Sequence, residues 1–238
     1  MSTPAFYNAT TAEGTTPSFS FDTGTNAGRY VFCVTLINPA ETVTGITLGG
    51  TALASVSTFA DALLGWNVQG WELINAPSGV NTLTVSESVG IQNVYLVVAS
   101  WDTCDTVSPV ENRATFTTGD GNVNGGAIGS ASGKLVVLIG EDYAGGNAVD
   151  TSSEGTGVTK DFLSSGGSVK IGGYVLRKAG AASVTITDTL TCSNSSAVLD
   201  NFGYSFSLKS PESAGIVAIG GEGSSGGGIG TFAAGNAG

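Results

Sequence analysis

The chain has 238 residues, of which 41% are hydrophobic and only 11% are charged. That length allows a sizeable core that buries on the order of 70% of the unfolded surface. The net charge is −11, and the eight Lys and Arg residues form no basic run, so we expect neither nucleic acid nor a membrane surface as a partner. The chain has no His, which removes the commonest general base and metal ligand and every Ser-His or Cys-His catalytic pair.

The three cysteines, Cys33, Cys104 and Cys192, are far apart and form no CxxC pattern, so the sequence indicates no zinc site. Their odd number argues against a disulfide framework. We expect Cys33 to be a buried thiol within a strand, and a Cys104–Cys192 bridge stays open. No secretory signal or apolar run of transmembrane length is visible, so we expect folding in a cytoplasm.

The first third of the chain reads as strands joined by turns. Residues 1–16 are turn-like, and Gly49-Gly50 between two alternating runs predicts a two-residue hairpin. The run at 29–37 is apolar throughout, which is typical of a strand buried on both faces. We expect strands at 18–21, 29–37, 43–48 and 51–56, and one helical turn at 58–64.

The stretch from Gly70 to Val85 reads as strand, turn, strand. Trp71 and Leu73 share one face at the two-residue period of a strand, and a Trp on a sheet face needs a second sheet to cover it. Residues 75–79 hold a proline and a glycine that mark a turn, and Gly70 marks a bulge. A two-layer β protein follows from this stretch.

The rest of the sandwich consists of apolar or alternating runs between polar loops. Residues 102–126 and 141–168 are predicted to be mostly loop. Strands are expected at 94–101, 114–117, 134–139, 158–163, 169–177, 183–188 and 202–208. About a dozen short strands predict an all-β fold, an antiparallel, jelly-roll-like β-sandwich over residues 18–210, after an extended segment at 1–17.

Residues 211–238 form a glycine-rich C-terminal arm outside the sandwich. A segment of this composition buries too little to offset its ordering entropy, so an outside surface must hold it. We expect the arm to bind a neighbouring subunit, or a different constituent of the same particle, through its apolar residues, which are Ile216, Val217, Ile219, Ile229 and Phe232.

Several of these stretches resemble a known family. The hairpin at 43–53, the Trp71–Gly79 strand and turn, the Ala99-Ser100-Trp101 strand end with the loop at 102–109, and the run at 133–137 are similar to parts of jelly-roll-like β-sandwich domains. Such domains occur in phage virion proteins and in bacterial surface proteins. The resemblance covers about residues 18–209 and implies the fold more strongly than the function, since the family shares no catalytic set.

Three motifs bear on chemistry. Asp120, Asn122 and Asn124 resemble the start of a calcium loop, but position 131 is Ala where a bidentate Glu is needed, so a plain turn is the better interpretation. The acids near strand ends, Asp102, Asp105, Glu141 and Asp142, show no acid–base spacing, so we expect no enzyme and no cofactor. Trp71 and Trp101 are expected in the core, while Trp66 is the best candidate for an exposed, sugar-stacking role.

We therefore expect a virion structural protein of a bacteriophage, assembled in the host cytoplasm. The leading hypothesis is a capsid decoration or cement protein that binds the major capsid protein or another virion protein. It would act as a homo-oligomer, for which a trimer is one arrangement. The alternative is a glycan- or receptor-binding domain of a tail fibre or a bacterial surface adhesin.

Overall fold

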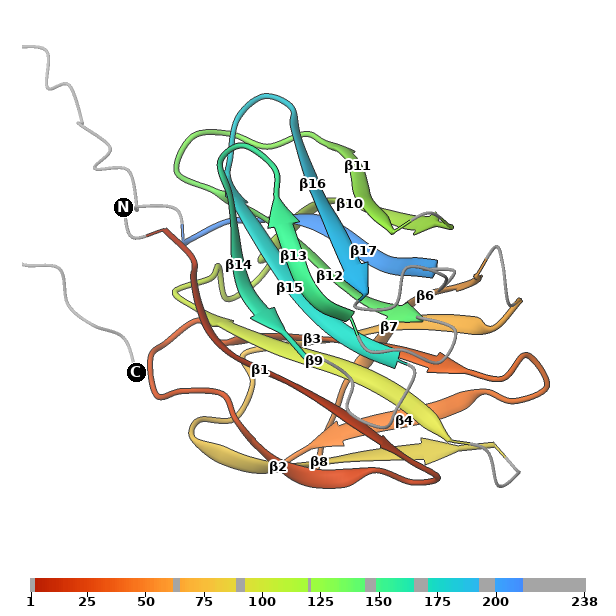
Figure 1. Ribbon diagram of the computed structural model, residues 1–238. Helices are drawn as coiled ribbons and strands as arrows, with labels where there is room; N and C mark the ends of the chain where they lie inside the picture. The colour runs from red at the N-terminus through yellow and green to blue at the C-terminus, as the bar shows by residue number, and fades with distance from the viewer. Residues whose placement is uncertain are drawn as a thin grey trace, which may run out of the picture.

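The computed structural model describes residues 3–61, 65–88, 93–119, 121–143, 149–164, 171–192 and 200–211. These residues form antiparallel strands and contain no helix. The strands assemble into four sheets that stack as four layers, so the all-β sandwich prediction is confirmed (Figure 1). The stretch predicted as one sandwich holds two of them, packed face to face.

The first sandwich pairs an outer and an inner sheet. The outer sheet has the order β2-β8-β4-β5, formed by Ser18–Asp22, Val80–Glu87, Val43–Leu48 and Thr51–Ala52. The inner sheet has the order β1-β9-β3-β7-β6, formed by Ala5–Gly14, Val94–Asp102, Tyr30–Ile37, Asn67–Ile74 and Ala54–Ala60. Trp71, Leu73, Leu83 and Val85 fill the core between these sheets, as their alternation predicts.

The second sandwich has the same layout. Its inner sheet has the order β10-β17-β12-β15-β14, formed by Val110–Thr118, Asp200–Leu208, Leu135–Tyr143, Ile171–Ala179 and Val158–Leu163. Its outer sheet has the order β11-β16-β13, formed by Asn122–Ile128, Val184–Cys192 and Val149–Glu154.

The two sandwiches are repeats of one topology. If β10 is matched to β1 and the chain is followed in order, every strand of the second sandwich takes the sheet position of its counterpart, and only β5 has none. Each repeat has a jelly-roll-like strand order, in which the first strand pairs with the last. An ungapped alignment of 70–85 with 173–188 retains five identical residues, at Gly70, Leu73, Ala76, Thr82 and Thr84 of the first repeat.

A third core joins the repeats. The inner sheets face each other, and their facing side chains form one buried apolar cluster that includes Trp101 and Phe32 from the first repeat and Tyr204 and Phe206 from the second. The aromatic rings interlock: Phe32 and Phe206 have centroids 4.9 Å apart, and Trp101 and Phe206 5.9 Å apart. Because Trp101 is fully buried, its predicted core role is confirmed, and the two repeats form one continuous body.

Glycine allows a close approach between the repeats at Gly70. A Cβ on Gly70 would lie 2.6 Å from Cζ of Tyr204, so any larger residue would collide with that ring. The predicted bulge at Gly70 is wrong, since β3 and β7 pair there without a register shift. The bulge lies opposite, in β6 between Ser55 and Ser57.

Of the other local predictions, the turn is confirmed and two assignments of secondary structure are wrong. Gly49 and Gly50 both have positive φ, 57° and 80°, as the predicted two-residue turn requires. Residues 5–14, read as turn-like, form the edge strand β1, and residues 58–60, read as helical, belong to β6. In both places the pairing of a neighbouring strand outweighs weak local propensity.

Candidate functional site

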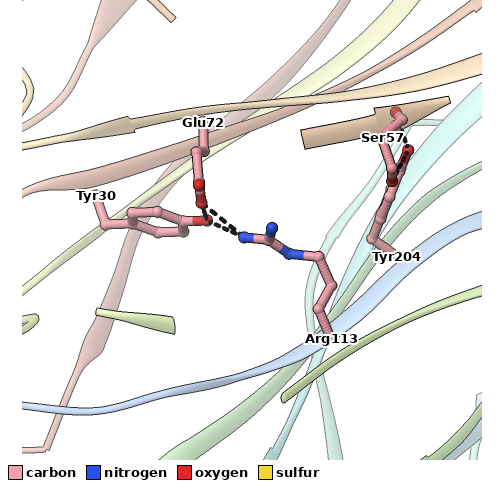
Figure 2. Close-up of polar contacts among 5 residues, drawn as sticks. All are labelled: Tyr30, Ser57, Glu72, Arg113 and Tyr204. Carbon is pink, nitrogen blue, oxygen red and sulfur yellow. Dashed lines mark hydrogen bonds and ion pairs between the residues drawn. The ribbon is translucent and has the colours of Figure 1, made fainter. Parts of the chain in front are cut away.

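The most organised polar site lies on the seam between the two repeats (Figure 2). The Tyr30 hydroxyl donates to Oε2 of Glu72 at 2.8 Å, and the Arg113 guanidinium lies 2.6 Å from the same oxygen. Tyr30 and Glu72 come from the first inner sheet, whereas Arg113 comes from the edge strand β10 of the second. Beside them, the Tyr204 hydroxyl donates to the backbone oxygen of Ser57 at 2.8 Å.

Backbone geometry aims Arg113 at this site. A register shift between Glu111 and Arg113 makes a bulge in β10, and the intervening Asn112 has a φ of 49°. The guanidinium then lies over the rings of Phe32 and Phe206, 5.3 and 5.8 Å from their centroids. The side chains of Arg113 and Glu72 are only 22% and 23% exposed, so the pair is partly shielded from solvent.

Burial, followed by the charge of Glu72, raises the pKa of Tyr30 well above its usual value. The cluster therefore holds the repeats together and offers no ionised nucleophile.

Buried carboxyls gather near the seam and were missed as a group by sequence reasoning. Asp61 and Asp200 come from different repeats, are almost fully buried, and hydrogen-bond each other. Burial, with the hydrogen bond and charge of Asp61, raises the pKa of Asp200 to about 8. Two carboxyls held close together repel when both are ionised, which favours the protonated form of Asp200. No residue spacing brings positions 61 and 200 together before the repeats are stacked.

The predicted acid candidates do not form a catalytic pair. Glu141 and Asp142 are adjacent in β12, so they point to opposite faces of the sheet, and both are buried. Burial raises the pKa of Glu141, and it raises the pKa of Asp142 to about 7. Asp105 instead accepts backbone N–H groups from Ser108 and Val107, which lower its pKa. The structure does not bring these acids to one accessible cleft.

The calcium candidates fall on a strand rather than in the predicted loop. Asn122 and Asn124 are alternate, exposed residues of β11, and Asp120 lies outside the described residues. Thr189 donates to Oδ1 of Asn122 at 3.3 Å, and these side chains line a shallow groove of about 220 Å³ with Asn124 and Thr187. Within the described ranges, no three acidic, Cys or His residues surround a point where a metal could bind.

The remaining candidates are placed as follows. Trp66 is half-buried, 6.1 Å from Tyr95 and 6.4 Å from Tyr143 by ring centroids, at the rim of the seam. Cys33 and Cys104 are free, buried thiols, so Cys104 forms no bridge to Cys192. The arm residues Ile216, Val217, Ile219, Ile229 and Phe232 lie outside the described residues.

Comparisons with known proteins find no relative of this chain. Searches against family models, curated proteins and solved structures return no match to this chain. Across the described ranges, no helix is long and apolar enough to cross a membrane.

Proposed function

We propose that this chain is a virion structural protein of a bacteriophage, and specifically a capsid decoration protein that binds and reinforces the shell. The observation that carries the proposal is the joining of two jelly-roll-like repeats by a continuous apolar core. Jelly rolls are a common architecture of viral capsid and lectin domains. A fused pair without mobile joints is suited to bearing load between neighbours, because its sheets cannot slide without breaking a packed core.

The distribution of polar groups also favours binding over catalysis. Asp142 and Asp200, whose pKa values are raised to about 7 and about 8, are buried inside the body. The outer sheets present threonine side chains to solvent, including Thr82 and Thr84 on β8 and Thr187 and Thr189 on β16. The partners under this proposal are the major capsid protein or another virion protein, and further copies of the chain, with assembly in the host cytoplasm.

One observation favours the alternative of a glycan- or receptor-binding domain of a tail fibre or adhesin. Trp66, Tyr95 and Tyr143 form a half-buried aromatic cluster. Nearby, the side-chain amide of Asn93 donates to the carboxylate of Glu13 at 2.8 Å, and Glu13 lies opposite Tyr95 on the neighbouring strand β1. Aromatic faces beside amide and carboxylate groups are the chemistry that holds a saccharide. The same trio also closes one end of the core between the repeats, which is why we place this reading second.

The experiment is an add-back assay on virus particles. Particles encoded by the same genome are prepared with this gene deleted, purified protein is added, and bound protein and shell disruption temperature are measured. The proposal predicts saturable binding to the head and a higher disruption temperature. A variant ending at Pro211 should bind more weakly, because the arm is lost. Normal particles that contain none of this protein, or deleted particles that do not bind it, would refute the proposal. Binding to the tail alone would favour the alternative.

A further inference from the structure

A groove of about 420 Å³ lies at one end of the second repeat, where β12 begins and β15 ends. Its walls include Lys134, Arg177 and Lys178, which are three of the eight basic residues of a chain with a net charge of −11. Thr3 and Thr159 add hydroxyl groups to the wall. No acidic side chain of the described residues lines it.

The three cations have hydrogen-bonding capacity left for a ligand. Nε of Arg177 lies 2.9 Å from Asp161, and Lys134 pairs with Glu111, but neither acid lines the groove. The Lys178 ammonium has three donors, and its one hydrogen bond within the described part of the chain is a long one, 3.4 Å to the Thr185 carbonyl. Arg177 and Lys178 are each partly exposed; as neighbours in β15 they point to opposite faces of the sheet, and both line the groove because it lies at the end of the strand.

Comparison of the repeats shows that the fold does not require these charges. The ungapped alignment that matches Gly70 with Gly173 also matches Arg177 and Lys178 with Ile74 and Asn75. At the corresponding end of β7, the first repeat has an apolar side chain, Ile74, followed by an amide, Asn75. The two cations are therefore specific to the second repeat, as expected for a binding feature that was added to a common scaffold.

We propose that this groove binds a short, extended, carboxylate-rich peptide segment of a neighbouring protein subunit. Guanidinium and ammonium groups form charge-assisted hydrogen bonds to carboxylates, and the groove is large enough for a few side chains. A long polyanion such as nucleic acid is disfavoured, because its ends would pass over the acidic remainder of the surface. That the segment belongs to another virion subunit rests on the proposed function; the preference of the groove for carboxylates does not.

The test uses the full-length protein and fluorescein-labelled hexaglutamate, with binding followed by fluorescence anisotropy at about 50 mM salt, where screening is weak. We expect saturable binding that weakens steeply at higher salt. Lys178→Gln should weaken it about tenfold, because it removes a charge-assisted hydrogen bond. Lys160→Gln is the matched control: it removes the same charge on the adjacent strand β14, outside the groove wall. Thermal melting of each variant checks that the fold is retained.

Three results would overturn the inference. They are no hexaglutamate binding at low salt, equal weakening by Lys160→Gln and Lys178→Gln, and tighter binding of tripolyphosphate than of the peptide, which would indicate a site for small inorganic anions. Failure here leaves the add-back result untouched, so the groove and the particle role can fail separately.

Discussion

The buried Asp142 carboxyl should make the wild-type protein less stable as pH rises. Asp142→Asn should remove this loss of stability. Asp142 is 1% exposed, and burial raises its pKa from 3.8 to about 7. Between these two pKa values the folded state holds more protons than the unfolded state, so the free energy of unfolding falls as pH rises. This stabilisation is complete below the unfolded pKa and is lost by the time pH passes the folded one.

The magnitude follows from the difference of about 3 pKa units, which corresponds to about 4 kcal/mol in total at 1.36 kcal/mol per unit. Between pH 5 and pH 8, the part lost is about 2 to 3 kcal/mol. Asp142→Asn keeps the shape of the side chain and cannot ionise. The variant should therefore gain about 2 to 3 kcal/mol relative to the wild-type protein when pH is raised from 5 to 8.

Urea denaturation of both proteins at the two pH values measures this difference, with the m-value as a check on two-state behaviour. Asp105→Asn is the control that should show no change between pH 5 and pH 8, because backbone N–H groups lower the pKa of Asp105 below its usual value and its contribution is lost only at more acidic pH. If the difference in unfolding free energy between Asp142→Asn and wild type is the same at pH 5 and pH 8, the pKa of Asp142 is not raised into this range by burial, and the reasoning is refuted.

Three further predictions concern the seam between the repeats. Gly70→Ala places a Cβ 2.6 Å from the Tyr204 ring and should cost about 1 to 3 kcal/mol in urea denaturation; an unchanged midpoint would contradict the close approach. Arg113→Met should cost about 1 to 3 kcal/mol, and Glu72→Gln in the same chain should restore part of it in a double-mutant cycle; a coupling energy near zero would show that the ion pair is not formed. Trp101→Ala should cost about 3 to 5 kcal/mol, and a smaller loss would mean that the inter-repeat core is loosely packed.

The fold class was predictable because period-two alternation survives wherever one face of a sheet is buried. Trp71 and Leu73 face the first core as expected, and the two positive φ values at Gly49 and Gly50 follow from the residue type. The edge strand β1 was harder to predict from the sequence, because it has little apolar alternation. It is held in place by pairing with β9, which lies far along the chain. Local sequence carries no record of such pairing.

The duplication and the sites were hidden for a related reason. Only five of 16 aligned positions are identical in the best-preserved stretch, so the repeat becomes clear only when strand order is compared. Arg113 meets Glu72 and Asp61 meets Asp200 across the seam, and those contacts exist only after the repeats stack. Trp66 could be singled out in advance because it borders a loop, but its ring contacts with Tyr95 and Tyr143 could not.

We propose that the two fused jelly-roll-like repeats form one rigid body that binds a viral shell. The most direct measurement is an electron cryomicroscopy reconstruction of particles encoded by the same genome. We predict density for the four-layer stack on the head surface, with both repeats in one fixed relation and the end that carries Lys134, Arg177 and Lys178 against a neighbouring subunit. A complete head and tail reconstruction without density for this stack would contradict the account.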